Sequence, residues 1–182
     1  HCVMVEEKDI ELMGEKGVTA IHNPSSNLKL GSGVMPIRSM LEHQVRVTIG
    51  TDSSASNNNQ NMLEEMHLAA IVHCGVNHDP TIITPQDVLS MATCNGAAAQ
   101  GRNDSGSLAV GKKADLAIIN LDQAHLQPIH DYPSLITYSA QAGDVVMTIA
   151  NGKTLYDHGE FLTIDVQRVM HDLKACVDRL FK

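Results

Sequence analysis

Apolar positions in the first hundred residues follow two spacings. Residues 18–21 and 45–49 are short apolar runs of the kind that forms strands. Helical spacing occurs before, between and after them, and predicts helices at residues 6–16, 36–41, 62–73 and 88–92. Strands that alternate with helices through short links are typical of βα units, so we predict a parallel sheet.

End signals agree with these boundaries. Gly17 predicts the end of the first helix, and Pro36 suits the first turn of the second. Residues 57–60 are predicted to cap the long helix, and Thr84 to cap the next one. The long helix presents one apolar stripe, formed by Met62, Leu63, Met66, Ala69, Ala70 and Val72 or His73.

The pattern changes after residue 103. Residues 114–121 and 145–150 are β-type runs, and the Asn151-Gly152 pair predicts a hairpin turn into a further strand at 153–156. Residues 165–181 have the spacing of an amphipathic helix. We therefore predict three regions: barrel-type βα units at 1–103, a small composite β domain at 104–163, and a C-terminal helix at 164–182.

Composition narrows the function classes. A chain of 182 residues that is 43% hydrophobic can bury a substantial core. Its formal charge of −8 argues against partners such as nucleic acid or an anionic membrane surface. The sequence has no run of about 18 apolar residues, so it predicts no membrane span. The four cysteines form no Cys-x-x-Cys pair, and together these features favour a cytoplasmic enzyme with reduced thiols.

The strongest candidate for chemistry is Asp52. It follows the apolar run 45–49, and Gly50 lets the backbone turn between them. Barrel enzymes carry their catalytic groups at the carboxyl ends of their parallel strands. A carboxylate at that place suits a metal ion or a proton transfer. The alternative is a helix cap or a turn residue without catalytic function.

Several segments together carry a family resemblance. The chain begins His-Cys-Val, and the following segments keep the order 22–31 (HNPSSNLKLG), 50–53 (GTDS), 57–59 (NNN), 106–116 (GSLAVGKKADL), 144–153 (DVVMTIANGK) and 159–165 (GEFLTID). This series resembles the last three strand ends and the tail of the amidohydrolase superfamily. It is most similar to the branch of S-adenosylhomocysteine and 5'-methylthioadenosine deaminases, with the chlorohydrolase-type triazine and guanine hydrolases as relatives.

The resemblance implies an α/β fold. The expected architecture is the C-terminal part of a metal-dependent hydrolase TIM (β/α)8 barrel, followed by part of a small β-sandwich domain and a C-terminal helix. A complete barrel takes about 250 residues, and no His-x-His pair of the family's metal site occurs in the chain. We therefore expect the chain to be an incomplete and inactive portion of a longer enzyme, whose N-terminal half would be its partner.

The resemblance also assigns site residues. Asp52 matches the aspartate that binds the metal, which would be one zinc or, alternatively, iron, with the other ligands outside this chain. Asp52 would also take a proton from the attacking water. His1 matches the histidine after the sixth strand, which orients that water, and both residues would contact the substrate. For His22 and Asn23, after the preceding strand, fixing the loop is favoured over lining the pocket.

Three functions remain open. The favoured one is hydrolytic deamination of an adenine-type nucleoside such as S-adenosylhomocysteine or 5'-methylthioadenosine. The second is a triazine- or guanine-type chlorohydrolase or aminohydrolase acting on another small heterocycle. The third is a non-catalytic fragment or binding remnant. An isolated partial barrel exposes sheet edges and apolar faces, so we expect it either to self-associate into a homo-oligomer or to fold only against its missing complement. The other histidines, His67 and His73 among them, are interpreted as packing or surface residues.

Overall fold

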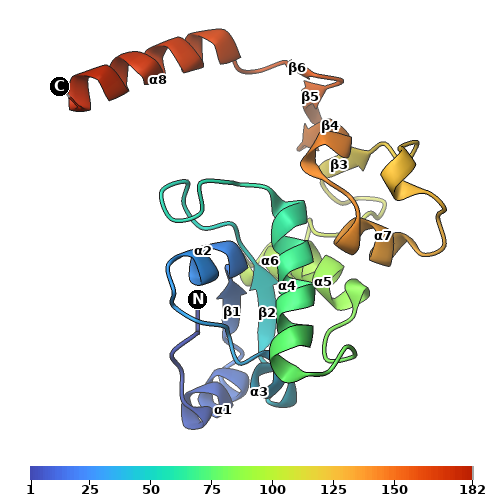
Figure 1. The fold of residues 1–182 in the computed structure, drawn as a ribbon. Coiled ribbons are helices and arrows are strands. Elements are labelled where there is room, and N and C mark those ends of the chain that lie inside the picture. Colours follow the sequence, from blue (N-terminus) through green and yellow to red (C-terminus); the bar gives the residue numbers. More distant parts are fainter. Residues whose placement is uncertain (182) are drawn as a thin grey trace. The chain divides into compact units, whose positions relative to one another are not determined.

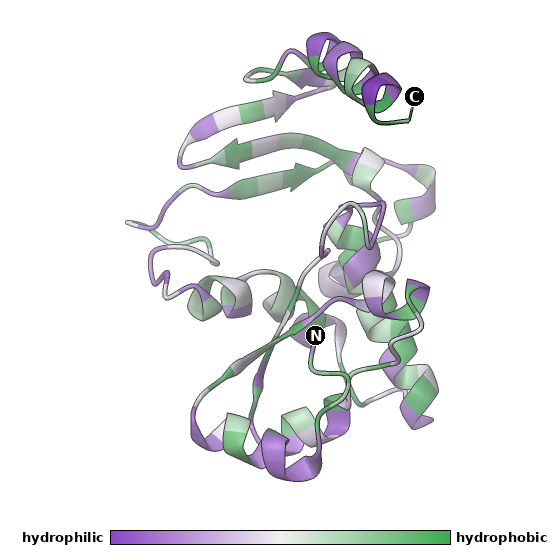
Figure 2. Ribbon diagram, turned by 90° about the vertical axis from the view of Figure 1, so that its left-hand side faces the viewer, coloured by the Kyte–Doolittle hydropathy of each residue, from purple (hydrophilic) through white to green (hydrophobic). Residues whose placement is uncertain are grey.

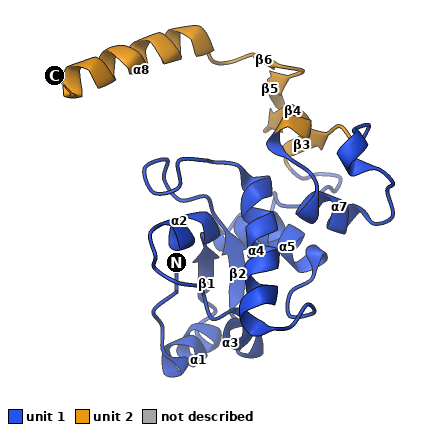
Figure 3. Ribbon diagram, viewed as in Figure 1, with its two compact units in different colours: residues 1–112, 121–142 blue, residues 113–120, 143–182 orange. Residues whose placement is uncertain are grey.

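The computed structural model describes residues 1–181 and divides them into two compact units (Figures 1 and 3). Unit 1 comprises residues 1–112 and 121–142, and unit 2 comprises residues 113–120 and 143–182. The predicted division at 103/104 and 163/164 stays a prediction. Residues 121–142, which we had expected within the β region, group with unit 1.

Unit 1 contains two strands among helices. In chain order its elements are α1 (Glu7–Glu15), β1 (Thr19–His22), α2 (Pro24–Lys29), α3 (Ile37–Glu42), β2 (Arg46–Ile49), α4 (Met62–Asn77), α5 (Pro85–Ala92), α6 (Cys94–Ala99), the 3₁₀ helix η1 (Ala124–Leu126) and α7 (Tyr132–Tyr138). The strands pair in parallel, from Thr19 opposite Arg46 to His22 opposite Ile49. Both strands therefore end at the same edge, and the predicted parallel pairing is confirmed.

Helix ends show why the segments fold locally as they do. Gly17, with φ of +63°, follows Lys16, the C-cap residue of α1, as predicted. Thr84 and Asp87 form a reciprocal capping box at α5. The predicted cap of α4 at 57–60 is wrong, because Asn61 accepts the hydrogen bond from the Leu63 amide. Asn57 is instead held in the preceding loop, where its side chain donates to the Thr51 carbonyl.

The core of unit 1 lies between the strands and the surrounding helices. Ala20 of β1, Val47 of β2 and Ala69 of α4 are each at most 2% exposed. The predicted stripe on α4 is confirmed, since Met66, Ala69, Ala70 and His73 are buried and Met62 and Leu63 pack against the core. The same face of α4 also buries Glu65, a charged side chain that the apolar pattern did not single out. The core thus fixes α4 beside the strand ends.

Unit 2 is an antiparallel sheet followed by a helix. Its elements are β3 (Leu116–Ile119), β4 (Val145–Ala150), β5 (Lys153–Asp157), β6 (Glu160–Phe161) and α8 (Val166–Leu180), with the 3₁₀ helix η2 (Ala142–Asp144) leading into β4. Asn151 and Gly152 both have positive φ and join β4 to β5, which confirms the predicted hairpin. Apolar residues predominate along β4 in Figure 2, and α8 carries both kinds of residue.

Three short helices, α2, α6 and α7, were not predicted. Each has six or seven residues, too few to show a helical repeat of apolar positions. Two of them begin with Pro at one of their first positions, which suits a helix start but is equally common in turns. Among residues 1–181, no helix combines the length and the apolar character that crossing a membrane requires.

Candidate functional site

The site is built where β1 and β2 end side by side. The Gly50 amide donates to the His22 carbonyl oxygen over 2.9 Å, which extends the strand pairing by one hydrogen bond. A Cβ atom added at Gly50 would lie 2.6 Å from Oδ1 of Asn23, so only glycine lets the two segments approach so closely. Two residues further on, Asp52 has a φ of +61°. For a residue with a side chain this conformation is uncommon, and it is concentrated at functional sites.

Asp52 is held by donors on both carboxylate oxygens. The Ser26 hydroxyl donates to Oδ2 over 2.6 Å, and the Ser53 amide donates to Oδ1 over 2.8 Å. These two hydrogen bonds hold the pKa of Asp52 below its usual value, because they favour the charged form. At neutral pH Asp52 is therefore a carboxylate. It does not cap α4, so the structure gives the simple capping alternative no support.

His1 lies next to this carboxylate. Its Nδ1 atom is 2.6 Å from Oδ1 of Asn27, and its Nε2 atom is 3.5 Å from Oδ2 of Asp52. An amide oxygen only accepts hydrogen bonds, so in the neutral ring the proton lies on Nδ1. The Nε2 atom faces Asp52. The two predicted site residues are thus brought together, while their catalytic roles stay predictions.

Two further site residues, Ser26 and Asn27, come from α2. Both are buried, and neither was singled out from the sequence. Their position within segment 22–31 was the available signal, since they follow the end of β1 directly. The Nδ2 atom of Asn27 is buried without a hydrogen-bond partner, which leaves one unused donor beside His1. Asn23, for which loop fixing was favoured, is also buried and lies against Gly50.

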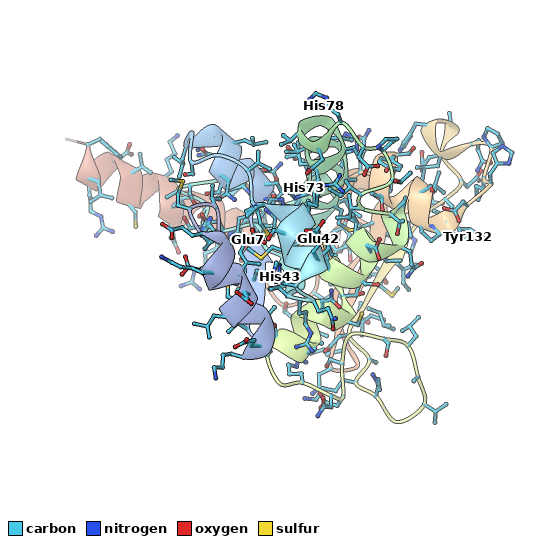
Figure 4. The ribbon with its side chains drawn as sticks, turned by 90° about the horizontal axis from the view of Figure 1, so that it is seen from below. Glu7, Glu42, His43, His73, His78 and Tyr132 are labelled. Atoms are coloured by element: carbon cyan, nitrogen blue, oxygen red, sulfur yellow. The ribbon has the colours of Figure 1, made fainter. Side chains whose placement is uncertain are left out.

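His22 belongs to a buried pair rather than to the exposed site. Its Nε2 atom lies 3.0 Å from Nε2 of His73 on α4, which Figure 4 labels. Burial lowers the pKa of His22 to about 3, with a further contribution from His73, and burial lowers the pKa of His73 to about 4. Both rings are therefore neutral at pH 7. The Nδ1 atoms of both rings are buried without a partner.

Figure 4 also shows a second histidine–carboxylate arrangement, between α1 and α3. Nδ1 of His43 lies 3.5 Å from Oε1 of Glu7, and the Ser39 hydroxyl donates to the same carboxylate over 2.8 Å. Here the Glu7 side chain is 67% exposed. Such an exposed contact stabilises little, and it joins two helices far from the strand ends. It is a surface link, not a second site.

The chain's own residues fit a metal ion only in part. Asp52 offers a fixed carboxylate, a ligand type that zinc accepts. Within residues 1–181, however, no three His, Cys, Asp or Glu side chains lie close enough together to hold a metal ion. A zinc site usually takes three or four protein ligands. Asp52 can therefore be one ligand of such a site, and this chain does not complete it.

Residues 1–155 match the model of the amidohydrolase family, so the chain belongs to this family. It is 45% identical over its whole length to a 5-methylthioadenosine/S-adenosylhomocysteine deaminase of Acetivibrio thermocellus and covers 42% of that protein. It is 46% identical over 99% of its length to a 5'-deoxyadenosine deaminase of Methanosarcina barkeri and covers 41% of it. The chain thus spans about two fifths of the length of these relatives.

Solved structures agree with this assignment. An adenosine deaminase from Xanthomonas campestris with bound zinc superposes with a TM-score of 0.94 at 36% identity, over 98% of this chain and 41% of that one. A zinc complex of atrazine chlorohydrolase from Arthrobacter aurescens gives a TM-score of 0.89 at 29% identity, over 96% and 39%. The predicted family and the predicted fold, part of an amidohydrolase barrel, are confirmed.

Proposed function

We propose that this chain is part of a zinc-dependent hydrolase that deaminates an adenine-type nucleoside. The observation that carries the proposal is the Asp52 carboxylate, held ionised by Ser26 and Ser53 beside His1 at the shared end of two parallel strands. The names of the relatives support the reaction class, since deaminases of adenosine derivatives recur among them. The two solved structures that are similar to this chain and contain zinc support the choice of zinc as the metal.

The reaction replaces the amino group on C6 of the purine by oxygen from water and releases ammonia. Zinc, when bound, supplies a water molecule whose pKa lies near 7. In this chain Asp52 would accept one proton of the attacking water at a carboxylate oxygen, because its lowered pKa keeps the carboxylate unprotonated at neutral pH. The proton would then pass to the departing amine. His1 would orient the water through Nε2, with Asn27 holding the ring.

The substrate class follows from what the relatives have in common. Their names include 5-methylthioadenosine, S-adenosylhomocysteine and 5'-deoxyadenosine, which share an adenine ring and differ at the 5' carbon of the ribose. We therefore propose a 6-aminopurine nucleoside with a modified 5' position as substrate. The remaining zinc ligands and the groups that contact the ribose would come from the part of the barrel that this chain does not contain.

A second candidate is hydrolysis of another heterocycle, such as a chlorinated triazine. It is favoured by the TM-score of 0.89 to the atrazine chlorohydrolase. The lower identity of 29%, against 45% to the deaminase of A. thermocellus, makes it the weaker candidate. For the 182-residue chain by itself we expect weak zinc binding and no turnover, because among residues 1–181 no further His, Cys, Asp or Glu side chains join Asp52 in a metal-binding group. Measurable turnover by this chain alone would contradict that expectation.

The test is ammonia release by a complete barrel protein that contains this chain. 5'-Methylthioadenosine, S-adenosylhomocysteine, 5'-deoxyadenosine, adenosine, guanine and atrazine are compared at equal concentration, and chloride release is followed for atrazine. We expect the highest kcat/KM with one of the first three substrates. A protein that dechlorinates atrazine faster than it deaminates any nucleoside would establish the second candidate. No turnover of any substrate in a zinc-loaded, folded protein would overturn both.

A further inference from the structure

Glu65 is a buried carboxylate in the apolar face of α4, and the reaction proposed above does not use it. Its side chain is 1% exposed. Burying a charged group is costly unless hydrogen bonds replace the lost water. Both of its oxygens are occupied: Oε2 accepts from the Ser25 amide over 3.1 Å, and Oε1 accepts from Nδ2 of Asn57 over 2.8 Å. The two donors come from different segments, Ser25 from the first turn of α2 and Asn57 from the loop before α4.

Both segments make hydrogen bonds at or next to Asp52. Ser25 is followed in the chain by Ser26, whose hydroxyl donates to Oδ2 of Asp52 over 2.6 Å. Asn57 donates a second hydrogen bond, of 2.6 Å, to the carbonyl oxygen of Thr51, the residue before Asp52. One side chain on α4 therefore holds both the residue next to Ser26, the donor to the Asp52 carboxylate, and the side chain that bonds to the backbone before Asp52.

A purely structural role for Glu65 would be that of a helix cap. The Ser25 amide is one of the free amides in the first turn of α2, where a negative charge is favourable. This explains only one of the two oxygens of Glu65. The second oxygen holds Asn57, which has no part in α2 and is itself only 8% exposed. Each of the two contacts holds a segment that in turn bonds to Asp52 or to the residue before it.

We propose that Glu65 is a positioning residue, which sets the orientation of the Asp52 carboxylate toward the metal ion through Ser26 and through Asn57. The proposal rests on the proposed function in so far as Asp52 is a metal ligand. Hydrogen-bond partners of metal ligands commonly change metal affinity by 10- to 100-fold. Glu65 would act less directly, because it contacts Ser25, the residue before Ser26, and Asn57, which bonds to the Thr51 carbonyl, rather than Asp52 or its donor Ser26.

The decisive variant is Glu65→Gln in the complete barrel protein. The amide keeps the size of the side chain, but its NH₂ group must face either the Ser25 amide or the Asn57 amide, so one donor meets another donor. Cobalt(II) serves as the probe in place of zinc, because its visible spectrum reports the geometry of its ligands. We expect the dissociation constant for cobalt to rise about tenfold, together with a changed visible spectrum.

The neighbouring residue provides a matched control. Glu64 lies on the same turn of α4, is exposed, and accepts a hydrogen bond only from the Asn59 side chain in the loop. Glu64→Gln makes the same chemical change and should leave the cobalt affinity and spectrum as they are. A folded Glu65→Gln protein with unchanged affinity and spectrum would overturn the proposal, as would equal effects from the two variants.

A double-mutant cycle tests the path through Ser26. Ser26→Ala removes the hydrogen bond to Asp52 directly, so in the double variant part of the effect of Glu65→Gln should already be lost. Losses in cobalt affinity that add in full would overturn this path. If Glu65→Gln fails to fold, Asn57→Ser removes the hydrogen bonds from Asn57 to Glu65 and to the Thr51 carbonyl, leaves the contact with Ser25 in place, and should still weaken cobalt binding; an unchanged affinity there would overturn the proposal as well.

The outcomes separate this inference from the proposed function. If the wild-type protein binds cobalt but deaminates no nucleoside, and Glu65→Gln weakens cobalt binding, the positioning role stands and the proposed reaction fails. If the wild-type protein deaminates a nucleoside and Glu65→Gln binds cobalt normally, the reaction stands and the positioning role fails. Cobalt affinity and ammonia release are measured independently, so each result has one meaning.

Discussion

Helix α4 makes two buried polar contacts with the chain segment at the end of β1, and they differ in how completely their atoms are bonded. Glu65 meets the Ser25 amide and the Asn57 side chain, so each of its oxygens has a donor. His73 meets His22, and each ring is left with an unpartnered Nδ1 atom. The first contact is saturated and leads to Asp52. The second stabilises the fold only while both rings are neutral.

The two sites differ in what lowers their pKa values, which is hydrogen bonding at Asp52 and burial at the histidine pair. At Asp52, donors on both oxygens favour the charged form and lower the pKa. At His22 and His73, burial disfavours the charged form and also lowers the pKa. The same direction therefore has opposite consequences, because a carboxylate becomes charged and an imidazole stays neutral. At neutral pH the Asp52 site therefore carries a negative charge, and the histidine pair carries none.

The largest expected effect comes from removing the negative charge of Asp52. Asp52→Asn keeps the size of the side chain but loses the proton acceptor, so kcat/KM for ammonia release should fall by about 10³-fold or more in the complete protein. Asp79→Asn is the control. Its hydrogen bonds to Thr81 and Arg38 hold the pKa of Asp79 at about 2, yet Asp79 lies outside the site. Comparable losses in the two variants would contradict a catalytic role for Asp52.

A smaller loss is expected when the orientation of His1 is disturbed. Asn27→Leu removes the oxygen that accepts from Nδ1 of His1, so the ring is free to turn and to exchange its proton between nitrogens. We expect kcat to fall by about 10- to 100-fold with a smaller change in KM. Steady-state kinetics of the complete protein measure both. A variant in which KM alone rises would show that Asn27 acts on substrate binding.

The histidine pair should make stability depend on pH. The unfolded-state pKa of a histidine is about 6.5, above the folded values of about 3 for His22 and about 4 for His73. The stabilisation is thus complete above pH 6.5 and is lost as the pH falls, because the unfolded chain takes up protons first. Each ring should cost up to about 1.4 kcal/mol per pH unit between pH 6 and 4.

Urea unfolding of wild type and His73→Leu at pH 7 and pH 5 measures this dependence. The variant lacks one of the two rings, so its free energy of unfolding should fall less between the two pH values. His43→Leu is a matched control, because His43 is only partly buried and faces Glu7. An identical pH dependence in wild type and His73→Leu would show that the buried pair does not govern stability in this range.

The sequence predicted the parts of the fold that repeat or end clearly. The two strands, the stripe on α4, the capping Thr84 and the Asn151-Gly152 hairpin follow from local patterns that need no tertiary information. The helices α2, α6 and α7 were missed because six or seven residues are too few to show a period. Their stability comes from packing, which the local sequence does not encode.

For the site, the sequence predicted the residues with evident chemistry and missed those that support them. Asp52 and His1 were identified through the family resemblance, and the structure places them 3.5 Å apart. Ser26, Asn27 and Glu65 act through contacts between residues 26 to 40 positions apart in the chain. In the sequence, nothing distinguishes Glu65 from the other charged residues of the predicted helix. Only its burial and its two partners reveal a different role.

The smallest effect should come from the asparagines before α4, and it separates the start of the helix from the loop that reaches Asp52. Asn61 accepts from the Leu63 amide at the helix start, so Asn61→Ala should lower the free energy of unfolding by about 1 kcal/mol. Because Asn61 contacts neither Ser25 nor Asn57, the two residues that donate to Glu65, cobalt affinity should stay unchanged. Asn57→Ser should do the opposite and change cobalt affinity more than the free energy of unfolding. If both variants changed stability and metal affinity in the same ratio, the loop and the helix start would act as one unit, and the separate role of Glu65 and Asn57 at Asp52 would be wrong.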